Sequence, residues 1–421
     1  MLSGPIARAT LQTSVALGLR LVVQAATLLL VARLLGSADY GRFAGVAALA
    51  AILGTLATFG THTLLLAEVA RADVRDSEIF PFAVTTTLLS GALLFVVFML
   101  LVSTVLGSVP VAPQVLVCIG AAELVLQPLL SLPSAVHQGG DRIVASQLLT
   151  TLPLFLRLAS AVLVWLLQPA DPLSWYAGGY LFAAALAVLA GIRSLGAKWP
   201  RIADWRLPSR AELARAAGYA VLNLTAMGPA ELDKTLALKL LPTSAAGIYS
   251  AGARAFGALT LPVIAMMLAA MPRLFREGAS ADGRSARLLR WIFFSALSYS
   301  IVLMGLLWWA APLIESLFGA RFSGMTLTIR WLTFALPGIG LRIAAGSALM
   351  SLGAPWMRVL FESAGLSVLL VAALALGRQS AAGMPIALGL SETTMAILGW
   401  WLVSHALARA AQGAIAAALP E

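Results

Sequence analysis

Charged side chains lie inside several long apolar segments of this sequence, where the chemistry open to them is the binding of charge. An ionised group in the hydrocarbon core of a membrane costs free energy, so it usually faces protein or a watery cavity. Residues of this kind, together with two amides on the same segments, are the candidate site: Arg20, Gln24, Glu123, Arg157, Asn223, Asp233, Lys234, Arg254, Arg342 and Glu392.

The spacing of these residues predicts polar faces on helices. Arg20, Gln24 and Thr27 follow one another at intervals of four and three residues, so at about 100° per residue they share one face of a helix. Asn223 and Lys234 also share a face of a later helix. Such faces do not suit lipid, and we expect them to enclose a polar, mainly cationic chamber.

Two interpretations of the charges stay open. In the first, each charge only pairs with an opposite charge on a neighbouring helix, which suits Glu123 and Asp233 because acids are few and bases are near. In the second, some of the bases bind an anionic ligand, because the deep bases outnumber the deep acids. The bases concerned are Arg20, Arg157, Lys234, Arg254 and Arg342.

The carboxylates have a further candidate role. Glu123, Asp233 and Glu392 could carry a proton or another ion in a coupled transporter, or could hold helices together. No paired carboxylate motif accompanies Glu392, which favours a hydrogen bond to a neighbouring helix. Glu362 has Arg358 one turn before it, and we expect these two to form an ion pair.

The composition is that of an integral membrane protein. Of the 421 residues, 60% are hydrophobic and only 11% are charged, and the mean hydropathy is +0.93. Soluble domains carry about 25% charged residues. Apolar runs of about 20 residues, long enough to cross a hydrocarbon core of roughly 30 Å, recur along the whole chain. The runs are too long and too continuous for the strands of a β-barrel.

These runs predict an all-α fold with about twelve transmembrane helices. The predicted helices are 11–33, 43–67, 81–106, 114–135, 145–167, 174–192, 215–239, 246–271, 288–310, 327–350, 357–376 and 384–406.

The distribution of Lys and Arg predicts the orientation of the chain. If both termini are cytoplasmic, most Lys and Arg residues fall on the cytoplasmic side, loop after loop. The net charge of +10 is then an orientation signal and an attraction to anionic membrane lipids. It does not indicate binding of nucleic acid.

The chain is predicted to consist of two similar lobes. The stretch VARLLGSADYGRFAG at 31–45 returns 206 residues later as ALKLLPTSAAGIYSA at 237–251. The long polar stretch 193–214 divides the helices six and six. We therefore expect an N-terminal lobe over 1–192, a basic cytoplasmic linker over 193–214 and a C-terminal lobe over 215–421. The lobes would be parallel repeats.

Motifs of enzyme chemistry are missing from the sequence. His62, His137 and His405 are scattered, Cys118 is the single cysteine, and no spacing typical of a metal site occurs. Nucleotide-binding and nucleophile-elbow motifs are absent as well. A membrane glycosyltransferase would need larger outer loops. We therefore expect neither an enzyme, nor a cofactor, nor a metal.

Two stretches of the sequence resemble a known family. RLLGSADYGRFAGVAALAAILGTLATFG resembles the first and second helices of bacterial polysaccharide transporters, and ELDKTLALKLLPTSAAGIYSAGARAF resembles their seventh and eighth helices. These are the Wzx-type O-antigen and exopolysaccharide flippases of the multidrug, oligosaccharidyl-lipid and polysaccharide exporter (MOP) superfamily. The resemblance covers twelve helices in two lobes, the fold of the multidrug (MATE) exporters.

The resemblance implies a flippase in the bacterial inner membrane. Its substrate would be an undecaprenyl-diphosphate-linked oligosaccharide for O-antigen, exopolysaccharide or capsule, moved from the cytoplasmic to the outer leaflet by alternating access. The diphosphate would suit Arg20, Lys234, Arg254 and Arg342. The resemblance also implies a monomer, with polysaccharide polymerase or assembly proteins as partners.

Three alternatives are open at this point. The main one is an ion-coupled multidrug exporter of the same superfamily, although export of a cation favours carboxylates in the chamber and this sequence offers more bases. The lipid II flippases have two further helices that are not found here. A membrane scaffold for sugar assembly is the third, and it would tolerate neutral substitutions of the bases.

Overall fold

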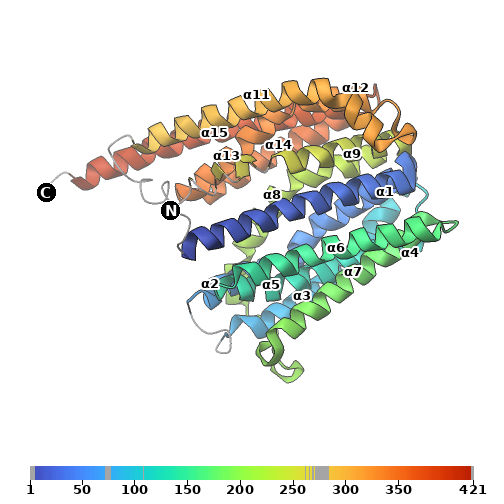
Figure 1. Cartoon of the computed structure of the whole chain (residues 1–421). Helices are drawn as coiled ribbons and strands as arrows, with labels where there is room; N and C mark the ends of the chain where they lie inside the picture. Colours follow the sequence, from blue (N-terminus) through green and yellow to red (C-terminus); the bar gives the residue numbers. More distant parts are fainter. Residues whose placement is uncertain are drawn as a thin grey trace. The chain divides into compact units, whose positions relative to one another are not determined.

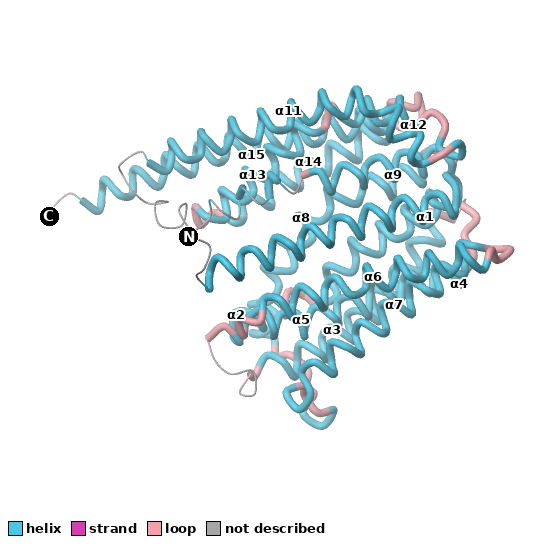
Figure 2. The backbone as a smooth tube through the Cα atoms, viewed as in Figure 1, coloured by secondary structure: helices cyan, strands magenta, loops and turns pink. Residues whose placement is uncertain are grey.

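The fold is helical throughout the part of the chain that the structure describes. This computed structural model describes residues 5–71, 77–107, 109–260, 262–264, 266–267, 270 and 284–418. Every regular element in these ranges is a helix, and Figure 2 shows helices joined by short loops. The predicted all-α class is confirmed.

Many of these helices are long and apolar enough to span a membrane. Among the described residues eight single helices meet that requirement, and a ninth span exists if a pair bent by 45° counts as one. The first of the eight, Gly18–Ala57, has 40 residues and would be about 60 Å long at 1.5 Å per residue. That is twice the hydrocarbon thickness. It is broken at Gly36 (φ 73°), so it holds two predicted spans.

Two predicted spans are not among the helices that meet the requirement, one because of its charges and one because of its length. The helix α8 (Arg210–Leu240) carries Glu231, Asp233 and Lys234 within one turn, which lowers its hydropathy. The helix α9 (Thr243–Leu259) has 17 described residues, and the end of the predicted span 246–271 lies partly outside the described residues. Every predicted span has a helical counterpart in the described chain.

The chain forms two compact units, residues 1–227 and 228–421. In the first unit α1 lies against α3 and α6, α6 lies against α7, and α5 packs against α2 and α6 (Figure 1). The elements of this unit are α1 (Pro5–Ala57), α2 (Thr61–Val69), α3 (Ile79–Val105), α4 (Pro113–Ala121), a π turn (Ala122–Leu126), α5 (Gln127–Gly139), α6 (Ile143–Leu167), α7 (Pro172–Leu195), two 3-10 turns (Gly196–Lys198 and Ile202–Asp204) and the first part of α8.

In the second unit α15 lies along α14 and α13, and α11 packs on α12 and α13. Its core includes the buried side chains of Ile292, Phe361 and Met395. The elements are the rest of α8, α9, α11 (Arg284–Phe318), a 3-10 turn (Ala320–Phe322), α12 (Met325–Thr333), α13 (Leu336–Ser351), α14 (Pro355–Leu376) and α15 (Gly383–Ala418).

The boundary between the units lies within α8, whereas the sequence places it in the linker 193–214. The linker groups with the first unit because it is folded onto that unit. Trp199 and Trp205 pack against the core of the first unit, and the ring of Trp199 meets that of Phe80 edge to face at 5.3 Å. The start of α8 is held as well, since Gly60 leaves no room for a side chain against the Ala216 carbonyl.

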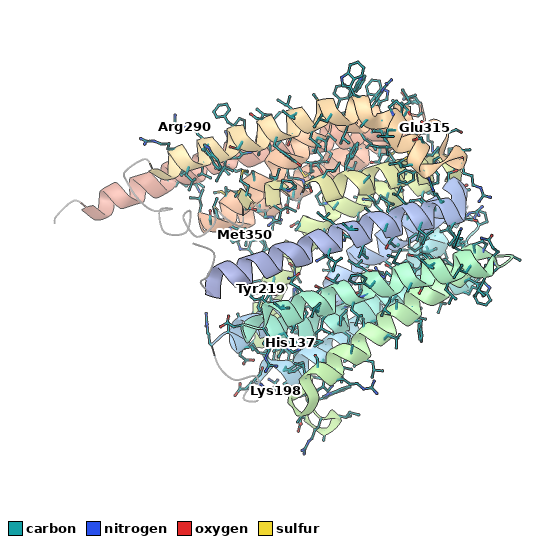
Figure 3. The ribbon with its side chains drawn as sticks, viewed as in Figure 1. His137, Lys198, Tyr219, Arg290, Glu315 and Met350 are labelled. Carbon is teal, nitrogen blue, oxygen red and sulfur yellow. The ribbon has the colours of Figure 1, made fainter. Side chains whose placement is uncertain are left out.

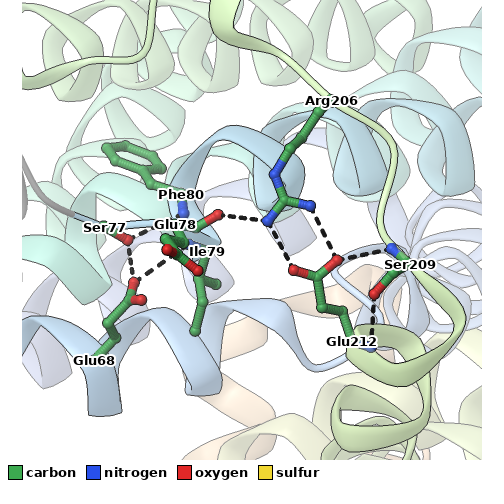
Figure 4. Close-up of polar contacts among 8 residues, drawn as sticks. All are labelled: Glu68, Ser77, Glu78, Ile79, Phe80, Arg206, Ser209 and Glu212. Atoms are coloured by element: carbon green, nitrogen blue, oxygen red, sulfur yellow. Dashed lines mark hydrogen bonds and ion pairs between the residues drawn. The ribbon is translucent and has the colours of Figure 1, made fainter.

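Arg206 joins three segments at the end of the linker (Figure 4). It donates two hydrogen bonds to the Glu212 carboxylate at 3.0 and 2.7 Å, and one to the Glu78 carbonyl at 3.0 Å. Ser209 and Glu212 exchange backbone and side-chain hydrogen bonds in a capping box at the start of α8. The linker is therefore a defined structural element and not a flexible tether.

The repeated stretches of sequence have equivalent local structure. In the first copy the helix breaks at Gly36. In the second copy α8 ends at Leu240 and α9 begins at Thr243, which follows Pro242. At an offset of 206 residues Gly36 aligns with Pro242 and Phe43 aligns with Tyr249, and both of these aromatic side chains are buried. Each unit thus contains the same hairpin-like break.

The outer faces of the helices are apolar, as a lipid environment requires. Along α11, between Arg290 and Glu315 in Figure 3, Phe294, Val302 and Leu306 are exposed. Trp309 on the same helix is 81% exposed. In water such a surface would be a large unpartnered apolar patch, whereas tryptophans near helix ends are typical of membrane interfaces.

The helix formed by α4 and α5 contains a π turn that holds Glu123. The π turn Ala122–Leu126 inserts a residue between α4 and α5. Two glycines on neighbouring helices allow close approach to it. A Cβ on Gly54 would lie 2.5 Å from the Glu123 carbonyl oxygen, and a Cβ on Gly91 would lie 2.5 Å from that of Leu124. These contacts fix the turn against α1 and α3.

We predict that Gly54→Ala destabilises the protein by about 1–3 kcal/mol, because the added methyl group overpacks the contact with the π turn. Gly178→Ala is the matched control, since Gly178 is a helical glycine with open space around its Cβ position. That change should be neutral or stabilising by about 0.5–1 kcal/mol. The measurement is the thermal unfolding midpoint of the purified protein in detergent, and equal midpoints for the two variants would contradict the prediction.

The clamp at Arg206 predicts a pH dependence of stability. The Arg206 hydrogen bonds lower the pKa of Glu212 from 4.5 to about 2. A lowered carboxyl pKa stabilises the fold above the unfolded value and loses this effect as pH falls through the folded value. Wild type should therefore exceed Glu212→Gln in unfolding temperature above pH 4.5, and the difference should shrink between pH 4.5 and 2.

Asp141→Asn is the control for this comparison, because the Asp141 side chain is exposed and has no hydrogen bond among the described residues. A difference between wild type and Glu212→Gln that stays constant from pH 7 to pH 3 would count against the clamp.

Candidate functional site

The first unit contains a buried ion pair between Glu123 and Arg157. Arg157 on α6 donates from Nη2 to Glu123 Oε1 at 3.0 Å, and both side chains are largely shielded from solvent. The π turn presents Glu123 at this point, and α6 lies beside it. The ion-pair interpretation of Glu123 is confirmed. Arg157, which the sequence offered as an anion ligand, is neutralised by this partner.

Aromatic rings complete this cluster. The Tyr180 hydroxyl on α7 donates to the same oxygen of Glu123, and the Arg157 guanidinium lies over the Tyr180 ring at 3.6 Å. Phe43 packs edge to face against Tyr176 and Tyr180, with centroids 5.3 and 5.7 Å apart. The charge pair is thus enclosed by rings, which favour a cation on their faces.

Arg20 and Gln24 have a different environment. Both lie on α1 with side chains of intermediate exposure. Among the residues that the structure describes, neither makes a hydrogen bond or an ion pair. Thr27, on the same predicted face, donates to the Val23 carbonyl of its own helix at 2.7 Å. This part of α1 therefore offers a cation and an amide that are open to a ligand.

Asn223 on α8 offers a second amide. Its side-chain nitrogen is buried and has no hydrogen-bond partner in the described part of the chain. A buried amide without a partner costs about 1–3 kcal/mol, so it is a candidate for contact with a ligand or an ordered water.

Asp233 and Lys234 form a buried charge cluster in the second unit. Lys234 Nζ lies 3.1 Å from Asp233 Oδ1 and 3.7 Å from Glu231 Oε2, and it also donates to the Ala230 carbonyl. The Tyr249 hydroxyl donates to Asp233 Oδ2 at 2.9 Å. Asp233 has a basic partner, as expected, but this partner is the next residue of the same helix and not a base on a neighbouring helix. Lys234 is already surrounded by acceptors.

Arg342 and Glu392 form the second buried pair of this unit. Arg342 Nε donates to Glu392 Oε2 at 2.7 Å, from α13 to α15. Their side chains are only 9% and 2% exposed. This is the contact between neighbouring helices that the sequence favoured for Glu392 over a proton relay. The predicted pair of Arg358 and Glu362 is also present, at 3.0 Å. Arg254, on α9, is partly buried.

The structure thus separates the predicted bases into two kinds. Arg157, Lys234 and Arg342 have carboxylate partners within their own unit, whereas Arg20 has none among the described residues. Fewer of the predicted bases are therefore available to bind an anionic ligand than the sequence indicated. Within the described chain, no group of three or more His, Cys, Asp or Glu side chains is placed to hold a metal ion.

Tyrosines at the charge clusters escaped the sequence analysis. Tyr180 and Tyr249 each donate to a buried carboxylate. Tyr176 and Tyr180 lie one turn apart on α7, and this spacing of aromatics with polar tips was the available signal. Glu231 was also missed as a partner of Lys234.

Comparison with known proteins identifies the family of this chain. The family described as "Polysaccharide biosynthesis protein" matches residues 6–277, more than half of the chain. No curated protein matches the chain.

Solved structures with a similar fold are membrane transporters of low sequence identity. The inward closed lipid II flippase MurJ aligns with a TM-score of 0.74 and 11% identity, covering 96% of this chain and 90% of its own. An inward-facing MATE multidrug resistance transporter aligns with a TM-score of 0.71 and 13% identity, covering 93% and 95%. A MOP superfamily transporter from Pyrococcus furiosus gives 0.66 and 14%, covering 95% of both chains.

These similarities show the fold, and they agree with the MATE-like architecture expected from the sequence. The expectation of a transporter rather than an enzyme is supported by the family. The chain is a multi-pass membrane protein with the fold of MOP transporters, and it belongs to the polysaccharide biosynthesis protein family.

Proposed function

We propose that this protein is a flippase for an undecaprenyl-diphosphate-linked oligosaccharide. It would move this substrate from the cytoplasmic to the outer leaflet of the bacterial inner membrane, in the biosynthesis of O-antigen, exopolysaccharide or capsule. The movement would follow alternating access. No cofactor enters the proposal, and a monomer would suffice.

The observation that carries this proposal is the state of Arg20. A guanidinium of intermediate exposure within a membrane helix, with no described partner, suits an anionic ligand. The substrate diphosphate supplies such a charge, and a guanidinium binds phosphate oxygens through paired hydrogen bonds. Gln24, one turn later, and the amide of Asn223 suit sugar hydroxyls.

The state of the carboxylates supports the same choice of substrate. A multidrug exporter that couples a cationic drug to an ion needs carboxylates that are open to cations. Here Glu123, Asp233 and Glu392 each accept a hydrogen bond from a base of the protein. Ion coupling at these sites would first have to displace Arg157, Lys234 or Arg342. We therefore rank the multidrug exporter second.

The remaining bases have roles that follow from their partners. We propose that Arg157 and Arg342 hold neighbouring helices of their own units together, and that Lys234 neutralises Asp233 within α8. A direct contact with substrate then falls first to Arg20. Arg254 remains a candidate for the same role. Polymerase or assembly proteins are proposed partners, as the family implies.

Arg20→Gln should lower flux about tenfold or more at subsaturating substrate, because a hydrogen bond to a charged group contributes about 1.5–3 kcal/mol. The measurement is the leaflet distribution of undecaprenyl-diphosphate-linked glycan in native-host cells lacking the chromosomal copy. We expect build-up on the cytoplasmic leaflet, relieved by wild type and in part by Arg20→Lys.

Arg378→Gln is the matched control, because Arg378 is an exposed arginine outside the described helices. It should behave as wild type. Wild-type flux in Arg20→Gln would remove Arg20 from the site. An unchanged glycan distribution without the protein would overturn the flippase and move the multidrug exporter to first place.

The orientation is tested by labelling single cysteines. In a Cys118→Ser background, a cysteine at the exposed position Ala203 should be protected from a membrane-impermeant maleimide in intact cells and react after permeabilisation. A cysteine at the exposed position Ser380, in the loop before α15, should react in intact cells. Reaction of Ala203→Cys in intact cells would overturn the cytoplasmic placement of the linker.

A further inference from the structure

The linker between α7 and α8 covers a cavity of about 670 Å³ that the transport proposal does not use. The cavity walls come from the first unit only. Val84 and Leu88 on α3, Leu129 on α5 and Ile192 on α7 form one side, and Trp199 and Trp205 form the other. This volume lies in the range of small-molecule sites, and the lining is that of an apolar ligand.

The linker is rigid enough to form such a wall. Gly196 takes a positive φ of 54° to turn the chain out of α7. The Trp205 ring nitrogen donates to the Pro200 carbonyl at 3.3 Å, and the Arg201 backbone nitrogen donates to Asp204 at 3.2 Å. With the clamp at Arg206, these bonds hold the two tryptophans over the ends of α3, α5 and α7.

The outer surface of the linker combines apolar and basic side chains. Ile202 and Leu207 are 79% and 67% exposed, although they belong to a polar segment. Arg193, Arg201 and Arg210 are exposed as well. Of the two acids in the segment, Glu212 is held by Arg206, and Asp204 accepts from the Arg201 backbone. A folded segment of this composition at the ends of membrane helices is typical of contact with anionic headgroups.

We propose that this cavity and the linker form a binding site for an anionic phospholipid of the leaflet that the linker faces. One acyl chain would enter between Trp199, Trp205 and the α3 wall. The phosphate would lie at Arg201, which is exposed and lines the cavity. Ile202, which also lines the cavity, would contact the bound lipid, and Leu207 would insert among neighbouring lipid chains.

Two observations favour an anionic phospholipid as the ligand: the charge of the linker and the apolar surface beside the cavity. The linker carries five Lys and Arg residues against two acids, and this positive excess favours an anionic headgroup over a zwitterionic one. Close to the lining residues along the same helices, Leu89 on α3 and Leu189 on α7 are 56% and 41% exposed. We expect a bilayer lipid to reach the site along this apolar surface. The site is independent of the transported substrate.

The test is native mass spectrometry of the purified full chain with equal amounts of phosphatidylglycerol and phosphatidylcholine of the same acyl chains. Wild type should retain phosphatidylglycerol in preference. Ala197→Phe should fill the cavity and abolish the retained lipid, because Ala197 lines the cavity and is exposed. Ala203→Phe is its control, since Ala203 is exposed in the same linker but lies outside the lining.

Arg201→Gln should weaken phosphatidylglycerol binding about fivefold and leave phosphatidylcholine unchanged. Arg71→Gln, at an exposed arginine before α3, should have no effect. Equal retention of the two lipids, or wild-type retention in Ala197→Phe, would overturn the proposal. A polyprenyl phosphate that displaces phosphatidylglycerol from wild type and from Ala203→Phe, and that does not bind Ala197→Phe, would show that the site takes a different lipid and would overturn the proposed occupant.

Discussion

The cost of ionised groups in lipid is the constraint on which the rest of this structure depends. The side chains of Arg157, Lys234 and Arg342 are largely buried, and each has a carboxylate partner within its unit. Such pairs add little net stability, but loss of one partner leaves a buried charge that costs about 3–5 kcal/mol. The pairs of Arg157 and Arg342 each join two helices and therefore fix which helices can be neighbours, whereas Lys234 and Asp233 are adjacent residues of α8. Against this background a base without a partner, such as Arg20, is the exception that indicates a ligand.

Two kinds of local pattern in the sequence led to correct predictions. Apolar runs predicted the spans, and the i, i+4 spacing predicted the pair of Arg358 and Glu362. The scarcity of acids indicated that Glu123 and Asp233 would be paired. The identity of their partners could not be predicted, because Arg157 and Tyr180 reach Glu123 only through the packing of α6 and α7. The excess of bases was overestimated for a different reason: Glu231 lies three residues before Lys234 on the same helix, and this local spacing was not recognised.

The position of the unit boundary shows the same limit. A polar, basic stretch predicts a linker, and residues 193–214 do connect α7 to α8. Its tryptophans and Arg206 nevertheless bind it to the first unit, and the division falls inside α8 after Met227. The two units share the break after their first helix, yet they neutralise their charges differently. The first unit uses a ring-enclosed pair, whereas the second uses a lysine beside its own aspartate and an arginine shared between α13 and α15.

The π turn at Glu123 changes the direction in which one membrane helix faces its neighbours. A uniform α-helix presents one continuous buried stripe, so its two ends face the same direction. The extra residue in Ala122–Leu126 shifts the phase of everything after it by about 100°. Both parts of the helix contact α3 and α7, but α5 also packs against α2 and α6. The π turn therefore changes which side of the helix is buried, and Glu123 lies within the turn where this change occurs.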